Sequence, residues 1–118
     1  MDYTLLKKED MPIRLFDWGS LTWFANSQLG QSDYTLGFCV IKPGMQNSVH
    51  FHPNCVETLH VLKGTILHSI GDETVEMREG DTITLPINIP HNAKNISDTD
   101  VLLSISFSSG DRQTCNLV

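Results

Sequence analysis

The chain has 118 residues, with 8 Lys and Arg against 14 Asp and Glu, and its formal net charge is -6 when the five histidines are counted as neutral. This length suits one domain with one core, and the hydrophobic fraction of 40% is typical of globular proteins rather than disordered ones. Nucleic acid is excluded as a partner because phosphate binding needs a basic patch, and the basic pair Lys7-Lys8 is followed at once by Glu9 and Asp10.

Membrane insertion and secretion are not expected either. Residues 1–12 contain no apolar core of a signal peptide, and no apolar run approaches the roughly 20 residues of a spanning helix. The three cysteines, Cys39, Cys55 and Cys115, are odd in number and lack the close spacing of a metal site. These features predict reduced thiols in a cytoplasmic protein, with Cys55 buried and unreactive.

Taken in chain order, the predicted elements are strands. The opening residues 1–33 are the least regular part, although Trp18, Leu21, Trp23 and Phe24 around Gly19-Ser20 indicate a hairpin. From Tyr34 onward, β-branched and aromatic segments end at Gly, Pro or Asn/Asp turns. The predicted strands cover residues 34–41, 57–62, 65–70, 74–77, 82–85 and 101–108. No segment in this region shows a sustained helical period, so the sequence predicts an all-β sandwich, jelly roll or barrel.

Three of the histidines and one acid suggest a metal site. His50 and His52 are expected on the same face of a strand, about 7 Å apart, and Glu57 follows after a short loop. His91 comes 34 residues later, after a proline-bounded bend. Three imidazoles and a carboxylate inside a β-fold would bind a cation and leave coordination positions open, as catalysis requires.

The spacing of these residues resembles the two motifs of the cupin family. Residues at the fixed positions of the first motif are Gly44, His50, His52, Glu57 and Gly64, and those of the second are Gly80, Pro86, Asn88, His91 and Asn95. Fifteen residues separate the motifs, and one position departs from the family pattern, which usually has Gly where this chain has Asn88. Asparagine tolerates a left-handed backbone better than other residues with a side chain, so we expect the turn to survive.

The resemblance covers about residues 34–108 and implies an antiparallel jelly-roll β-barrel, also described as a double-stranded β-helix. We expect one cupin domain over residues 1–118, with residues 1–33 as an N-terminal hairpin or extension. All four positions that match the family's metal ligands are occupied, by His50, His52, Glu57 and His91. The resemblance therefore implies one divalent transition-metal ion per chain, with Mn, Fe, Ni and Zn all open.

Other residues receive structural interpretations. His60 has the opposite strand parity to Glu57 and should face away from the site, and His68 is expected at the surface or an interface. Phe51 should point to the face opposite its neighbouring histidines, and Asn95 should fix a turn. Trp18 and Trp23 could cover the mouth of the barrel, enter a dimer interface or pack in the core. Residues 109–114 are polar, and we expect a solvated tail rather than one folded over the pocket.

These observations predict a metalloenzyme that acts on a small polar substrate, sugar-like or acid-like, by Lewis-acid chemistry such as isomerisation or a lyase reaction. The alternatives are an iron-dependent dioxygenase and a non-catalytic sugar-binding or sensor module. The general base stays open: Tyr34 and Asp17 are candidates, with Arg14 as an anion clamp, only if the N-terminal segment reaches the pocket. Because an antiparallel sandwich exposes edge strands, we expect a homodimer, with residues 18–24 as the candidate contact.

Overall fold

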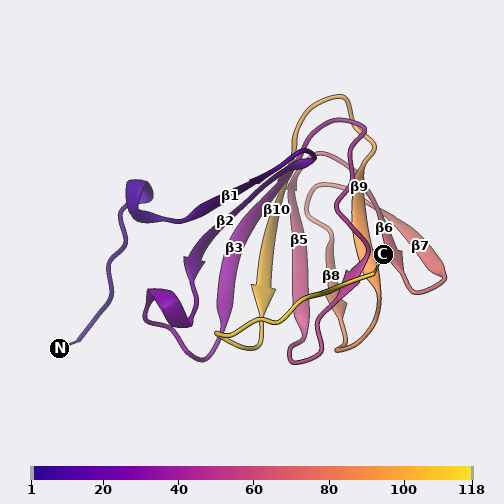
Figure 1. Ribbon diagram of the computed structural model, residues 1–118. Helices are drawn as coiled ribbons and strands as arrows, with labels where there is room; N and C mark the ends of the chain where they lie inside the picture. Colours follow the sequence, from indigo (N-terminus) through magenta and orange to yellow (C-terminus); the bar gives the residue numbers. More distant parts are fainter. Residues whose placement is uncertain (1, 118) are drawn as a thin grey trace.

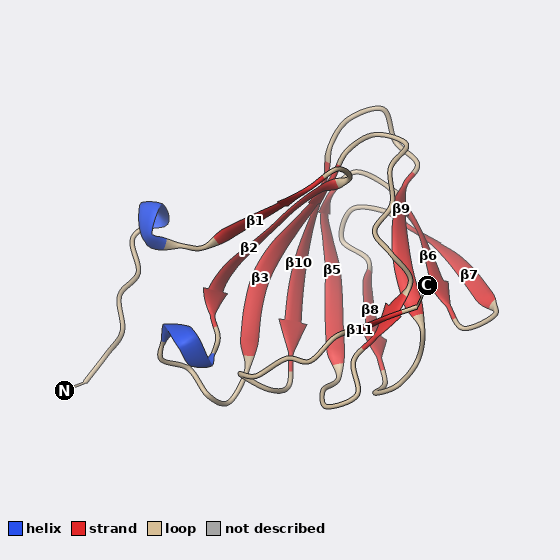
Figure 2. Cartoon of the chain, viewed as in Figure 1, coloured by secondary structure: helices blue, strands red, loops and turns tan. Residues whose placement is uncertain are grey.

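The computed structural model describes residues 2–117, which form strands and two single-turn 3-10 helices (Figures 1 and 2). The strands are β1 (Ile13–Phe16), β2 (Gly19–Ala25), β3 (Thr35–Ile41), β4 (His50–Phe51), β5 (Glu57–Lys63), β6 (Ile66–Ile70), β7 (Glu73–Met77), β8 (Thr82–Leu85), β9 (His91–Asn95), β10 (Val101–Phe107) and β11 (Cys115–Asn116). The 3-10 helices are η1 (Lys8–Asp10) and η2 (Ser27–Leu29). None of the helices in the described part of the chain is long and apolar enough to cross a membrane.

The strands form two antiparallel sheets that face each other. The larger sheet has the order β1-β2-β3-β10-β5-β8, and the smaller has the order β11-β4-β9-β6-β7. Figure 1 shows the larger sheet curving across the molecule, with β9, β6 and β7 of the smaller sheet at the right of the view. The predicted all-β jelly-roll architecture is confirmed. Within residues 2–117, strand pairing does not continue from one sheet into the other, so this jelly roll is an open sandwich rather than a closed barrel.

The six strands predicted between Tyr34 and Ser108 match β3, β5, β6, β7, β8 and β10 to within one residue at each end. The N-terminal hairpin also forms, but its turn lies at Asp17-Trp18, before the predicted glycine. The strand predicted at residues 50–52 is β4, whereas two strands, β9 and β11, were not predicted. The sequence of β9 is HNAKN, which has little intrinsic strand preference, and its extended form comes from pairing with β6.

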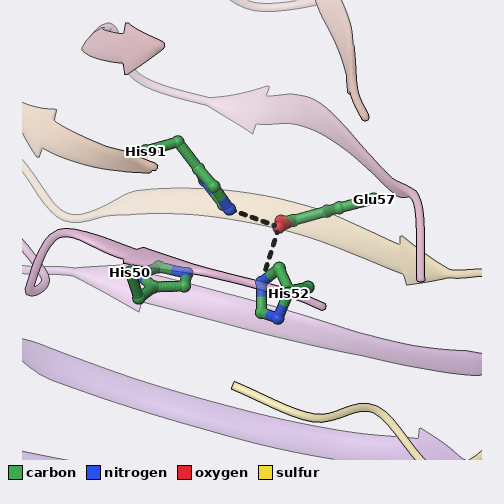
Figure 3. Close-up of side chains that lie close together, drawn as sticks. All are labelled: His50, His52, Glu57 and His91. Atoms are coloured by element: carbon green, nitrogen blue, oxygen red, sulfur yellow. Dashed lines mark ion pairs between the residues drawn. The ribbon is translucent and has the colours of Figure 1, made fainter. Parts of the chain in front are cut away.

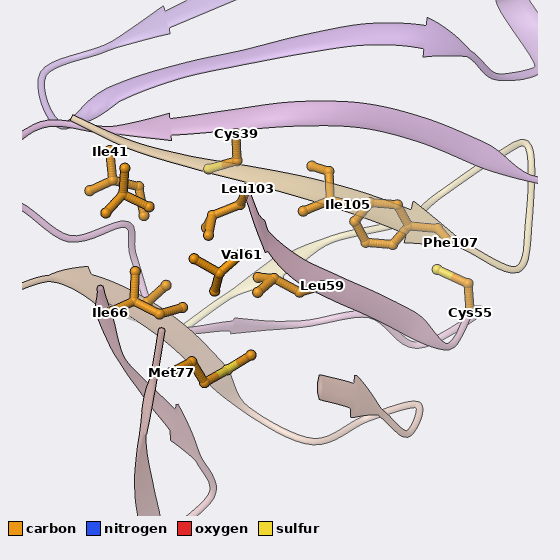
Figure 4. Close-up of a cluster of buried hydrophobic side chains, with 12 residues drawn as sticks. Cys39, Ile41, Cys55, Leu59, Val61, Ile66, Met77, Leu103, Ile105 and Phe107 are labelled. Carbon is orange, nitrogen blue, oxygen red and sulfur yellow. The ribbon is translucent and has the colours of Figure 1, made fainter. Parts of the chain in front are cut away.

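The hydrophobic core lies between the sheets and is formed by alternate residues of the central strands (Figure 4). On β5, Leu59 and Val61 are buried on the same side as Glu57, as their shared parity predicts. On β10, Leu103 and Ile105 face the same interior, and the intervening serines do not. The alternation that predicted these strands therefore also brings the carboxylate of Glu57 into the interior.

Two asparagines of the second motif have the expected structural roles. Asn88 has a φ of 65°, so asparagine does occupy the left-handed backbone position that the family pattern gives to glycine. The fully buried Asn95 donates from Nδ2 to the carbonyl oxygens of Ile41 and Thr99, at 2.8 and 2.7 Å. Its Oδ1 accepts from the amide of Ser97. Asn95 thus fixes the turn between β9 and β10, as predicted.

Candidate metal centre

The four predicted ligand residues come together from both sheets. His50 on β4 pairs directly with His91 on β9, and His52 lies one residue beyond the end of β4. Glu57 is the first residue of β5 in the opposite sheet. Figure 3 shows the carboxylate of Glu57 directed at the imidazoles of His52 and His91. We refer to these four residues as the four-residue centre.

The centre is compact and largely buried. One ligand atom from each of the four residues lies within 4.8 Å of the others, which is the arrangement of a site that could hold a metal ion. Oε1 of Glu57 is 3.2 Å from Nε2 of His52 and 3.4 Å from Nε2 of His91. These three residues are each at most 4% exposed, and His50 is half-buried. The carboxylate of Glu57 is therefore largely shielded from bulk solvent.

The outer nitrogens of two histidines are held by backbone carbonyls. Nδ1 of His50 lies 2.6 Å from the carbonyl oxygen of Ser48, and Nδ1 of His52 lies 2.9 Å from that of Gln113. A carbonyl oxygen can only accept, so each Nδ1 must carry the hydrogen, and in the neutral imidazole Nε2 then presents a lone pair. Such second contacts orient imidazoles for metal binding.

The inner atoms consequently lack hydrogen-bond partners. Nε2 of His52, Nε2 of His91 and Oε1 of Glu57 are buried and form no hydrogen bond with the described residues, although they are close together. With the hydrogen on Nδ1, the neutral ring of His52 has a lone pair on Nε2 that faces a lone pair on Oε1 of Glu57. Buried acceptors that face one another are unfavourable unless a cation lies between them. The residues present therefore fit a bound metal ion.

The charge state of the centre supports the same conclusion. Burial lowers the pKa of His91 to about 3 and also lowers the pKa of His50, so both imidazoles are neutral at neutral pH. Burial raises the pKa of Glu57, but contact with His52 and the proximity of His91 outweigh this effect and leave it below its usual range. The centre thus presents the buried carboxylate of Glu57 beside the neutral imidazoles of His50 and His91, which suits a divalent cation.

The four-residue centre opens into a cavity of about 290 Å³ between the sheets, which we call the intersheet cavity. Trp18, Leu21 and Trp23 line one side of it, so the two tryptophans cover this cavity and also pack against the core. Arg14 reaches the cavity from β1. Asp17 and Tyr34, the candidate bases, are not among the residues that line it.

His68 was placed wrongly by the sequence prediction. Its side chain is buried, lines the intersheet cavity and stacks on His91 with ring centroids 5.6 Å apart and an interplanar angle of 12°. The parity of β6 carried the missing signal, because His68 lies two residues from the buried Ile66 and so shares its inward face. His60 behaves as predicted, since it lies on the face opposite Glu57 and its ring contacts Thr82 Oγ1 at 2.6 Å.

The C-terminal tail, residues 109–117, was also predicted wrongly. Instead of projecting into solvent, it runs back across the fold, and β11 pairs with β4 beside the four-residue centre (Figure 2). Arg112 and Thr114 line the intersheet cavity. The side chain of Asn54 holds this segment, donating to the carbonyl of Asp111 at 2.8 Å and accepting from the amide of Gln113 at 3.0 Å.

Comparison with known proteins gives consistent matches. Oxalate oxidase 1 of Hordeum vulgare is 30% identical over 95 residues, which cover 74% of this chain and 46% of that protein. Polyketide synthase CurC of Streptomyces cyaneus is 25% identical over 80 residues, which cover 68% of this chain and 52% of that protein. The chain spans about half the length of the curated relatives it matches.

Solved structures share the fold. Oxalate decarboxylase of Lactobacillus farciminis, in a formate complex, matches with a TM-score of 0.85 and 21% identity, covering 92% of this chain and 34% of that chain. A mutant of Bacillus subtilis oxalate decarboxylase matches with a TM-score of 0.83 and 17% identity, covering 90% of this chain and 30% of that chain. A family model described as "Cupin domain" matches residues 37–107, which include all four residues of the centre. The chain therefore belongs to the cupin family.

Proposed function

We propose that this cupin is a metal-dependent enzyme in which His50, His52, Glu57 and His91 hold one divalent transition-metal ion. The observation that carries the proposal is the set of buried acceptors in the four-residue centre that face one another without hydrogen-bond partners. Mn, Fe, Ni and Zn are all compatible with imidazole and carboxylate donors. The substrate we propose is a small, oxygen-rich, sugar-like or acid-like molecule that fits a cavity of about 290 Å³.

The chemistry we propose is isomerisation or a lyase reaction. A divalent cation, when bound, supplies Lewis-acid polarisation of a substrate carbonyl or hydroxyl oxygen. The chain itself orients the imidazoles of His50 and His52 through the backbone carbonyls of Ser48 and Gln113. Trp18 and Trp23 add apolar surface to the cavity wall. Our candidate for proton transfer is His68, since its Nδ1 is buried at the cavity wall without a hydrogen-bond partner. His68 replaces Tyr34 and Asp17 in this role.

A second candidate function is oxygen-dependent oxidation by an iron-loaded or manganese-loaded form. The relative named oxalate oxidase 1 favours it, at 30% identity over 95 residues. Consumption of dissolved oxygen during turnover separates the two functions, because isomerases and lyases of the proposed kind consume none. Ligand-induced thermal stabilisation without turnover of any substrate would instead support a binding or sensor module.

Metal content tests the proposed centre. Protein purified without added metal should contain close to one divalent cation per chain by elemental analysis, and His50→Ala should lose most of it. His60→Ala is the matched control, because His60 lies on the opposite face of β5 and should retain the metal. A metal content near zero in the wild type, or a His50→Ala variant that binds metal as the wild type does, would contradict the proposal.

We also propose a cytoplasmic homodimer. The supporting observation is that β1 is the outermost strand of the larger sheet, and its Ile13 and Leu15 are 62% and 80% exposed. This moves the expected contact from residues 18–24, which partly face the intersheet cavity, to the neighbouring edge strand. Light scattering coupled to size exclusion should give twice the chain mass of 13.2 kDa, and Leu15→Lys should lower it toward one chain.

A further inference from the structure

The side chain of Arg112 lines the intersheet cavity but belongs neither to the four-residue centre nor to the proposed proton transfer. It comes from the C-terminal tail, is half-buried and contributes to the cavity wall. Its guanidinium carbon lies 4.5 Å from the ring centroid of Trp23 and 5.0 Å from that of Phe107. Two aromatic rings therefore hold the flat guanidinium in place beside the cavity.

The guanidinium of Arg112 forms no direct ion pair with an acidic side chain in the described part of the chain. Among residues 2–117, the close contacts between basic and acidic side chains are His52 with Glu57, His91 with Glu57, and Arg78 with Glu76, and none involves Arg112. The hydrogen bond found for its guanidinium runs from Nη1 to Oγ1 of Thr114, at 2.6 Å. A guanidinium has five N–H donors in a planar fork, so several donors are left for a ligand. Removing such a cation from water without a partner is unfavourable.

The charges around the cavity make it suited to an anion. The chain has 14 acidic residues, and within the described residues 2–117 Glu57 is the only one that lines the cavity. A bound cation would neutralise its charge. Arg14 and Arg112 both line the cavity. A protein with a net charge of -6 therefore has a cavity wall whose remaining fixed charges are positive. Such focused charge attracts small anions.

The backbone that carries Arg112 is fixed before any ligand arrives. The amide and carbonyl groups on either side of it are bonded to the side chain of Asn54, and the next residue, Gln113, accepts from His52. Gly110 is bonded to Ser32 through its amide and to Ser27 through its carbonyl. The guanidinium is thus preorganised next to the four-residue centre, which limits the entropy lost when a ligand binds.

We infer that Arg112 binds the carboxylate of the substrate, so that the substrate is a small carboxylic acid whose second oxygen group faces the four-residue centre. The guanidinium fork matches a carboxylate in shape and can donate two parallel hydrogen bonds to it. The assignment of Arg112 as the group that binds the substrate carboxylate depends on the position and contacts of Arg112 alone. The placement of the second oxygen rests on the proposed metal function.

Binding of matched acids and alcohols tests this inference. Lactate and glycolate serve as carboxylate probes, and propane-1,2-diol and ethane-1,2-diol serve as neutral counterparts that retain a hydroxyl group. Calorimetric titration of the manganese-loaded protein should show tighter binding of each acid than of its diol. Arg112→Gln should weaken acid binding about tenfold to hundredfold, the range for a lost charge-assisted hydrogen bond, and leave diol binding and metal content unchanged.

Two further variants separate recognition from structure. Arg112→Lys keeps the charge but not the planar fork, so it should lose less affinity for the acids than Arg112→Gln does. Arg78→Gln removes an exposed arginine on the β7 side of the fold and should bind all four probes as the wild type does. The inference is overturned if Arg112→Gln binds lactate and glycolate as the wild type does, if it loses diols and acids equally, or if inorganic phosphate displaces the acids at lower concentration.

The same titrations on protein stripped of metal with EDTA distinguish this inference from the proposed function. If the wild type binds no metal but acid binding still depends on Arg112, the metal function fails and the carboxylate assignment stands. If the metal is bound and acid binding does not depend on Arg112, the assignment fails and the metal function stands.

Discussion

At the scale of single residues, the environment of each side chain determines its reactivity more than its type does. The three cysteines show this clearly: Cys39 and Cys55 are 3% and 2% exposed, whereas Cys115 is exposed. Burial raises the pKa of Cys39 to about 12 and also raises the pKa of Cys55. Because the thiolate is the reactive form, burial suppresses both access and nucleophilicity at these two positions.

We therefore expect one thiol to react in the folded protein. Iodoacetamide at pH 8 should label Cys115 first, and all three cysteines should react in denaturant. Peptide mapping by mass spectrometry identifies the labelled residue, and Cys115→Ser should leave the folded protein almost unlabelled. Labelling of Cys39 at a rate close to that of Cys115 would show that the interior opens more readily than its packing indicates.

Asn88 is a residue whose backbone conformation matters more than its side chain. It has a φ of 65°, and its amide donates to the carbonyl of His52 at 3.0 Å, so this turn supports the four-residue centre. Asn88→Gly should change the free energy of unfolding by less than about 1 kcal/mol, because glycine adopts this conformation without strain but gains freedom in the unfolded chain.

Asn88→Val provides the contrast. A β-branched residue at positive φ is strained, so we expect a loss of about 1 to 3 kcal/mol in urea unfolding, together with weaker metal binding. Equal stability of the glycine and valine variants would contradict this explanation of the turn.

At the scale of elements, the packing of β2 on β3 depends on a missing side chain. Trp23 on β2 pairs with Gly37 on β3, and its ring lies against the glycine. A Cβ at position 37 would lie 2.6 Å from Cε3 of Trp23 and 2.5 Å from the carbonyl oxygen of Thr22. Both distances are too short for non-bonded heavy atoms, so a side chain at position 37 would displace its neighbours. The glycine therefore allows the Trp23 ring to lie where it contacts Arg112.

We accordingly expect Gly37→Ala to destabilise the fold by about 1 to 3 kcal/mol, as overpacking does in other cores. Urea unfolding followed by tryptophan fluorescence measures the change. Because the strain is shared, Gly37→Ala combined with Trp23→Phe should lose less stability than the two single variants added together. Strict additivity would mean that the alanine methyl is accommodated without moving the ring.

At the scale of the whole molecule, burial of several neutral imidazoles makes the stability of the metal-free protein depend on pH. The pKa of His91 is about 3 in the folded state, against 6.5 for an exposed histidine, because burial disfavours the imidazolium. Burial lowers the pKa of His50 and His68 as well. Between pH 6.5 and 3 the unfolded chain thus binds protons that the folded chain does not, so stability is lost as the pH falls through this window.

Urea unfolding of EDTA-treated protein at pH 7.5, 6.5 and 5.5 tests this effect. The free energy of unfolding should fall below pH 6.5 by up to about 1.4 kcal/mol per pH unit for each histidine involved. His91→Gln should show a shallower fall. The lowered pKa of Glu57 affects stability only below its ordinary value of 4.5, outside the range measured. Stability that stays constant or rises toward pH 5.5 would contradict the buried neutral state.

The sequence by itself determined the strands of the core and the composition of the centre. Alternation places every second residue on one face, so the inward parity of Glu57, Leu59 and Val61 could be read locally. The spacing of the two motifs grouped His50, His52 and His91 into one predicted centre, although the strand that carries His91 was not predicted. The alternation is local in the chain, and the structure agrees with it.

Only the tertiary structure decided what surrounds the centre. His68 meets His91 because β6 pairs with β9, and β9 has too little strand preference to be predicted alone. Arg112 reaches the cavity because Asn54, 58 residues earlier in the chain, bonds the backbone on either side of it. Contacts between segments so far apart depend on how the sheets pack, and neither residue periodicity nor composition records that packing.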